Sequence, residues 1–286
     1  MLILVKTASW AAVAALAGAA LGRFWLAPER PRAAGVVVAA ALAVPVLGAV
    51  ELWLTLAQVL SPVDVALWWR YATTTAHGDA VLWRSVAGLA LASAGLVLPR
   101  SWWPLAAGLG VWLCLGFSRV SHASAVGGTG PLLVDLVHLA GAALWAGGVW
   151  RVALGSGRPG LPEVERLSRL ALWVVVGLAI TGPVSALVHA SEPAGFFASG
   201  YAVALAVKSS LVAVTLVVAA ANRFVLLPRA RRGLPGMRAA LWAESALLLG
   251  VLAATGWLST SAVPHGAVDG VDVIENARRV LEFLRR

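Results

Sequence analysis

Residues 33–59 read AAGVVVAAALAVPVLGAVELWLTLAQV, and this stretch decides the class of fold. It contains a single charged residue, Glu51. It is also longer than the run of about 20 apolar residues that a helix needs to cross the hydrocarbon core of a membrane. The sequence therefore predicts an integral membrane protein built from helices.

The composition of the whole chain agrees with this prediction. Of its 286 residues, 60% are apolar and 12% are charged, whereas soluble domains carry about 25% charged residues. This balance excludes a cytosolic enzyme and a nucleic-acid-binding protein despite a formal net charge of +9, and we expect no catalytic activity. The single cysteine excludes a disulfide framework and a thiolate cage, and the 14 tryptophans suit two membrane interfaces.

Eight apolar stretches follow one another along the chain and predict an all-α bundle of about eight transmembrane helices. They cover residues 3–26, 33–59, 80–98, 102–123, 131–152, 167–189, 201–227 and 239–262. Pro45 and Pro183 fall inside these stretches and predict kinks, and the pair Gly147-Gly148 predicts close helix packing. The first stretch is interpreted as a retained helix rather than a signal peptide, because its arginines follow the apolar run.

The positive residues of the loops predict the orientation of the bundle. Arginines gather in the turns after the first, third, fifth and seventh stretches. Because Lys and Arg favour cytoplasmic loops, we expect this side to be cytoplasmic and both termini to be extracytoplasmic. We divide the chain into an N-terminal membrane half at 1–130 with an interfacial outer segment at 61–79, a second membrane half at 131–265, and a C-terminal amphipathic surface helix at 266–286.

All the histidines fall on the outer face or in the outer half of this predicted bundle. They are His77, His122, His138, His189 and His265. Polar side chains inside lipid are costly, so they usually face the bundle interior or a wet cavity. Helical spacing places further polar and aromatic groups on inner faces, namely Glu51, Cys114, Asp135, Trp145, Tyr201, Lys208 and Glu244. The sequence thus predicts a polar pocket that opens to the outside and is lined by imidazoles.

Imidazole ligands without thiolates suit copper, zinc, nickel or haem iron, and the spacing alone does not choose among them. Metal binding requires neutral imidazole, so it should weaken below about pH 6. Structural roles stay open beside these: His138 could bond Asp135, and Cys114 could be an apolar filler. Lys208 must be paired or neutral near mid-membrane, with Glu51 or Asp135 as its candidate partner.

Several different short motifs lie between about residues 118 and 265. They are Ser121-His122-Ala123, Asp135-Leu136-Val137-His138 leading to Leu144-Trp145-Ala146-Gly147-Gly148, Arg166-Leu167-Ser168-Arg169, Thr181-Gly182, Tyr201 with Lys208, Asn222-Arg223 with Pro228, Glu244 and Pro264. In these motifs the sequence resembles the CopD-type copper resistance membrane proteins, with the Asp-x-x-His…Leu-Trp-x-Gly-Gly block as the most specific element. The family usually has Gly-His-Ala at residues 121–123 and Tyr-Gly at residues 201–202, and the positions of His189 and His265 match no family motif.

The resemblance implies copper handling at the cytoplasmic (inner) membrane, with a small periplasmic copper-binding protein of the CopC type as donor or acceptor. We therefore expect a copper transporter, working inward, that receives the ion at His122 and His138. The remaining histidines would assist, and the polar faces around Glu51, Cys114 and Lys208 would form the deeper path. The alternatives are a b-type haem electron-transfer protein with paired histidine ligands, and a copper sensor or assembly scaffold without transport.

Overall fold

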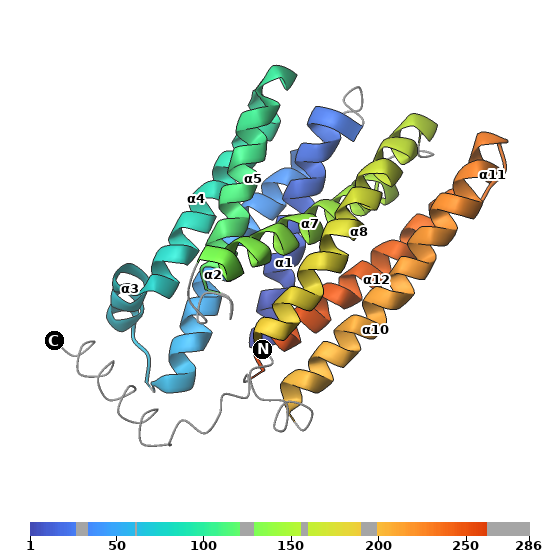
Figure 1. Ribbon diagram of the computed structural model, residues 1–286. Helices are drawn as coiled ribbons and strands as arrows, with labels where there is room; N and C mark the ends of the chain where they lie inside the picture. Colours follow the sequence, from blue (N-terminus) through green and yellow to red (C-terminus); the bar gives the residue numbers. More distant parts are fainter. Residues whose placement is uncertain (27–33, 61, 121–128, 156–159, 190–198, 262–286) are drawn as a thin grey trace.

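The computed structural model describes residues 1–26, 34–60, 62–120, 129–155, 160–189 and 199–261, and these form one bundle of helices without a strand (Figure 1). In chain order the elements are α1 (Leu2–Leu21), the π-helical η1 (Gly22–Leu26), α2 (Ala34–Val59), α3 (Val65–Thr74), α4 (Ala76–Val97), the short 3₁₀ helix η2 (Arg100–Trp102), α5 (Trp103–Ser118), α7 (Thr129–Ala153), α8 (Leu161–His189), α10 (Gly200–Ala221), the π-helical η3 (Asn222–Leu226), α11 (Leu227–Arg231) and α12 (Met237–Leu258). The surface helix predicted at 266–286 lies outside the described residues.

Seven of the described helices are long and apolar enough to cross a membrane. They are Leu2–Leu26, Ala34–Val59, Ala76–Val97, Thr129–Ala153, Leu161–Ala186, Gly200–Arg231 and Met237–Leu258. The stretch predicted at 102–123 forms α5, which has 16 residues; at about 1.5 Å per residue it is shorter than a hydrocarbon core of about 30 Å. The polytopic all-α membrane fold is thus confirmed. Pro45 and Pro183 lie inside α2 and α8, which continue past them.

The segment predicted at 61–79 as interfacial contains the short helix α3. Side chains cap the start of α3 and the start of the next helix, α4. The Asp64 carboxylate accepts a hydrogen bond from the Leu67 backbone N–H at 2.7 Å and caps α3. The Thr75 hydroxyl accepts one from the Gly78 N–H at 3.1 Å and caps α4. Because this cap follows α3 directly, the third membrane helix begins at Ala76, not at the predicted residue 80.

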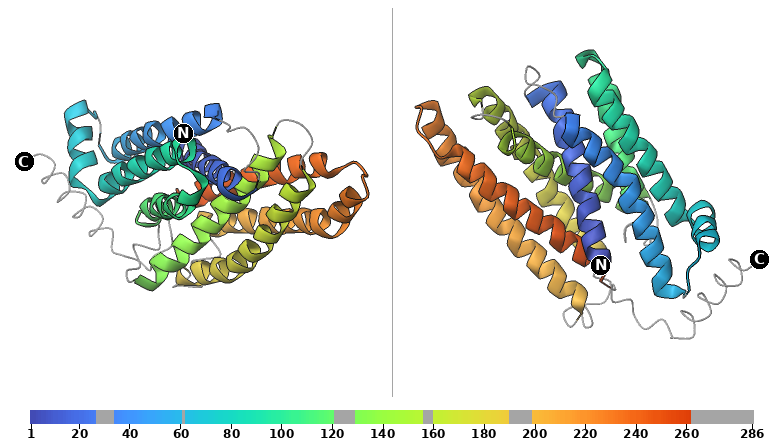
Figure 2. Two further views of the ribbon diagram at one scale, coloured as in Figure 1. Left: turned by 90° about the horizontal axis from the view of Figure 1, so that it is seen from above. Right: turned by 180° about the vertical axis from the view of Figure 1, so that it is seen from behind.

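The two halves of the chain meet along α1 and α7 at the centre of the bundle. Helix α1 contacts α2, α7 and α12, and α7 crosses the bundle obliquely beside it (Figure 2). A Cβ atom on Gly18 would lie 2.1 Å from the Gly147 carbonyl oxygen, and one on Gly147 would lie 2.0 Å from the Ala14 carbonyl oxygen. The backbones of the two helices therefore touch, and the prediction that Gly147 permits close packing is confirmed.

Helix α1 also contributes to both hydrophobic cores. Its residues Val13 and Leu16 pack in a core with α2, α4 and α5, whereas Ala14 packs in a second core with α7, α8 and α12. Lys6 near its start contacts Ser259 just past α12, so these two ends share one face of the bundle with α3. The arginines of η1 and α11 lie at the opposite end, which the arginine distribution predicts to be cytoplasmic.

Candidate functional site

The structure describes the surroundings of two of the five predicted histidine ligands, His77 and His138. His122, His265 and the side chain of His189 lie outside the described residues. His77 stands in the first turns of α4, whereas His138 belongs to α7. No group of three or more His, Cys, Asp or Glu side chains gathers as a metal site within the part of the chain that the structure describes. The two described histidines occupy separate polar sites.

The first site lies between α7 and α8, where His138 meets Thr181. The His138 Nδ1 atom is 3.0 Å from the Thr181 hydroxyl oxygen, and that hydroxyl donates its own hydrogen to the Gly177 carbonyl at 2.8 Å. A hydroxyl has one hydrogen to donate, so with that hydrogen on the Gly177 carbonyl it accepts from the imidazole. This bonding assigns the proton of the neutral ring to Nδ1 and leaves Nε2 with a lone pair.

Asp135 lies one turn before His138 on α7 and adds a carboxylate to this site. Its Oδ2 atom is buried without a hydrogen-bond partner. Lys208 of α10 interacts electrostatically with both Asp135 and His138. Of the two candidate partners predicted for Lys208, the structure therefore favours Asp135. Thr181, not Asp135, makes the hydrogen bond to the imidazole of His138.

A second polar group on α7 lies two turns further along, at Trp145. The Trp145 indole N–H donates to Glu244 Oε1 at 2.9 Å, and the Asn222 amide donates to Glu244 Oε2 at 2.6 Å. Glu244 is 4% exposed, and the three residues come from three separate elements: α7, η3 and α12. The neighbouring Arg223 instead donates to the Ser168 carbonyl and hydroxyl, each at 2.7 Å.

Asn222 begins a π-helical turn, a feature that is rare and often found at functional positions. The wider turn interrupts the α-helical register where the Asn222 side chain meets the carboxylate. Asn222 and Glu244 also line a cavity of about 220 Å³ whose other walls, from α7, α8, α10, α11 and α12, are mostly apolar. Tyr201 and Thr215 of α10 are buried, as is Asn222 at the start of η3.

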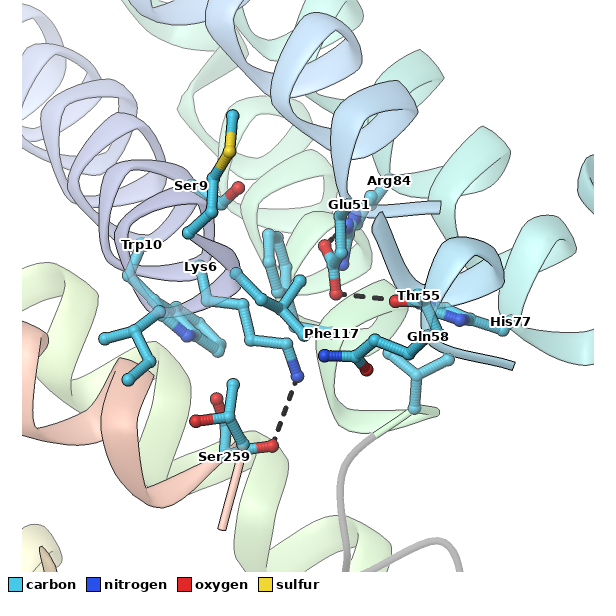
Figure 3. A pocket seen from close by; sticks show the side chains of 15 residues that line it. Lys6, Ser9, Trp10, Glu51, Thr55, Gln58, His77, Arg84, Phe117 and Ser259 are labelled. Atoms are coloured by element: carbon cyan, nitrogen blue, oxygen red, sulfur yellow. Dashed lines mark hydrogen bonds and ion pairs between the residues drawn. The ribbon is translucent and has the colours of Figure 1, made fainter. Parts of the chain in front are cut away.

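The other described histidine, His77, belongs to a larger cavity at the end of the N-terminal half where α1 begins. This cavity has a volume of about 700 Å³ and is lined by the predicted polar face of α2, with Glu51, Thr55 and Gln58 (Figure 3). Glu51 forms a buried ion pair with Arg84 of α4. The Arg84 guanidinium also stacks over the Phe117 ring, 4.2 Å from its centre.

Both ring nitrogens of His77 have polar neighbours. The Tyr71 hydroxyl is 3.0 Å from Nδ1, and Glu51 Oε1 is 3.6 Å from Nε2. Burial and the nearby Glu51 carboxylate raise the pKa of Tyr71, so the phenol keeps its proton at neutral pH and can donate to Nδ1. This arrangement leaves the imidazole without a free lone pair, unlike that of His138. The predicted metal ligation by His77 has no support in these contacts.

Cys114 and Arg84 are both buried in the N-terminal half. Cys114 is 4% exposed and packs within the core of the N-terminal half, which favours the interpretation as an apolar filler. Arg84, the buried partner of Glu51, was not predicted from the sequence. A lone arginine inside an apolar stretch is the signal that could have identified it, since such residues normally have a partner in the bundle.

Comparisons with known proteins place both halves of the chain among copper resistance proteins. The model of the "Copper resistance protein D-like, N-terminal domain" matches residues 1–132, and that of "Copper resistance protein D" matches residues 161–258. A curated relative, "Inner membrane protein YebZ" of Escherichia coli (strain K12), is 29% identical over 174 residues, or 57% of this chain. The match spans 60% of the length of that relative. No solved structure matches the chain.

Proposed function

Because the chain belongs to the CopD-type family of copper resistance membrane proteins, we propose that it transports copper inward across the cytoplasmic membrane. The path runs through the second membrane half, from the site at His138 toward Glu244. The Escherichia coli relative is named as an inner membrane protein, which supports this membrane as the location.

The observation that carries the proposal is the bonding of His138. Its Nδ1 is engaged by Thr181, which leaves the Nε2 lone pair for a metal ion. Imidazole nitrogen binds copper, and a hydrogen bond from the other ring nitrogen fixes the orientation of such a ligand. The unpartnered Oδ2 atom of Asp135 supplies a negative charge one turn away. These two groups together form an acceptor for a small cation.

Lys208 balances the charge of this site when copper is absent. Its ammonium interacts electrostatically with Asp135 when no copper is bound, which offsets the negative charge of the carboxylate inside the membrane. An arriving copper ion competes with the ammonium for the same negative charge. Release of copper then restores the lysine–aspartate interaction, so that the empty site does not hold an isolated charge.

Trp145 and Glu244 form the next polar site along the proposed copper path. Trp145 lies seven residues beyond His138 on the same helix, about 10 Å further along its axis. The Glu244 carboxylate that it contacts borders the apolar cavity between α8 and α12. Copper would be delivered to the outer end by a small periplasmic copper-binding protein of the CopC type, as the family membership suggests.

Copper binding by the purified protein tests this assignment. We expect His138→Gln to weaken copper binding at least about tenfold, because loss of one good metal ligand costs more than about 1.4 kcal/mol. His77→Gln is the matched control and should retain wild-type affinity, since both ring nitrogens of His77 already have partners. The measurement is equilibrium competition with a chelator, followed by metal analysis of the protein.

The same sample separates the alternatives. Unchanged copper affinity in His138→Gln would remove His138 from the path. A strong Soret band in the purified wild-type protein would favour the b-type haem protein over copper transport. A copper sensor or scaffold would bind copper with the same dependence on His138, and uptake into vesicles distinguishes it from a transporter.

A further inference from the structure

We propose that the outer cavity of the N-terminal half binds a singly charged phosphate-type oxyanion, supplied either by a phospholipid headgroup or by free phosphate. This cavity is the one of about 700 Å³ that contains Lys6, Glu51, His77 and Arg84. His138 is not among the residues that line it. The proposal therefore stands on a different set of contacts from the copper path and does not depend on it.

The charges of the lining favour an anion over a cation. The charged side chains that line the cavity among the described residues are Lys6, Arg84 and Glu51. Glu51 is already neutralised by its ion pair with Arg84, and its other oxygen faces His77 at 3.6 Å. Among these charged side chains, one positive charge is left without a carboxylate to balance it, on Lys6. A copper ion would be repelled by the lysine, whereas a monoanion would balance it.

Several polar donors at the cavity lack a full set of acceptors. The Lys6 ammonium, which has three hydrogens, donates to the Ser259 carbonyl at 3.2 Å. Ser9 and Arg84 are among the residues that line the same cavity, and the Ser9 hydroxyl and the Arg84 Nε atom are buried without a hydrogen-bond partner. Unsatisfied buried donors are costly, and an oxyanion offers several acceptor oxygens at once.

The shape and position of the cavity indicate the class of anion. Its volume lies within the range of about 300–1,000 Å³ that is typical of small-molecule sites. Aromatic side chains, Trp10 and Phe117, stand beside the polar groups in its wall (Figure 3). It lies at the end of the bundle where α1 begins and α12 ends, which is the predicted level of the outer headgroups. A phosphodiester with an apolar portion and a free phosphate both present the oxyanion that these donors would bind.

Binding to the delipidated, full-length protein in a neutral detergent tests the proposal. In one arm, inorganic phosphate is titrated calorimetrically into the protein. In the other, native mass spectrometry counts the retention of dioleoylphosphatidylglycerol against dioleoylglycerol, which lacks the phosphate. We expect saturable binding of one anion per protein and a loss of about tenfold or more in affinity for Lys6→Met, because one charge-assisted bond is removed. Lys6→Arg should retain binding, because it keeps the charge.

A second variant controls for general electrostatics. Arg70→Gln removes a positive charge from α3 at the same end of the bundle, outside the cavity lining, and should bind as the wild type does. Phosphate binding without lipid identifies a soluble anion as the ligand, and selective retention of the phospholipid alone identifies a headgroup. The proposal is overturned if the wild-type protein binds neither probe, or if Lys6→Met binds as tightly as wild type.

Discussion

Replacement of Gly147 by alanine should abolish the folded bundle, with a loss of about 3 kcal/mol or more in the free energy of unfolding. The added Cβ atom would lie 2.0 Å from the Ala14 carbonyl oxygen and 2.5 Å from the Gly18 backbone nitrogen. Both atoms belong to the backbone of α1, so no side chain can rotate away to make room. The contact could be relieved only by separating α1 from α7, and α1 contributes residues to both hydrophobic cores.

Gly110→Ala is the matched control for this substitution. Gly110 lies in α5, and a Cβ atom there would meet nothing within 4 Å. The variant should keep its stability to within about 1 kcal/mol, which is the scale of the helix propensity difference between glycine and alanine. The comparison uses the yield of monodisperse protein and the thermal unfolding midpoint in one detergent. Wild-type yield and midpoint for Gly147→Ala would show that the two backbones are not in contact.

Arg84→Met should destabilise the protein by about 3–5 kcal/mol, the usual result of leaving one member of a buried ion pair behind. Arg84 is 1% exposed, and its guanidinium pairs with Glu51 and stacks on Phe117. Methionine would fill part of the volume but would leave the Glu51 carboxylate buried and without its strongest partner. Denaturant or thermal unfolding of the purified variant measures the loss.

A double-mutant cycle isolates the ion pair from the packing of each side chain. Glu51→Gln in the Arg84→Met background should recover part of the loss, because it removes the uncompensated charge. The double variant should therefore be more stable than the sum of the two single effects predicts. Simple additivity would mean that Glu51 and Arg84 act independently and that the pair contributes little to the N-terminal half.

The membrane fold was largely predictable from the sequence because apolar runs report directly on lipid burial. The run at 33–59 became α2 at Ala34–Val59, and most of the others became helices that overlap them, whereas the run at 102–123 became the shorter α5. The junction at residues 75–76 was not predictable in this way. There Thr75 ends one helix and caps the next through a hydroxyl bond to Gly78, and a hydropathy pattern carries no record of such a bond.

The sequence identified the polar residues of the candidate site but not the side chains that each of them contacts. His138, Asp135, Glu244 and Lys208 stood out because polar side chains inside lipid must face a neighbour. The sequence could not choose that neighbour, since the choice depends on the rotation and tilt of the helices. The partner of Glu51 is Arg84, 33 residues away, and not Lys208. The role of His122 beside His138 stays a prediction, because His122 lies outside the described residues.

Copper uptake into sealed vesicles that contain the purified protein tests the central claim most directly. Wild-type protein should load copper into the vesicle interior at a rate above that of protein-free vesicles, and His77→Gln should do the same. His138→Gln should load copper no faster than empty vesicles, because its imidazole supplies the lone pair that receives the ion. Absence of loading by the wild-type protein, or equal loading by His138→Gln, would contradict the account.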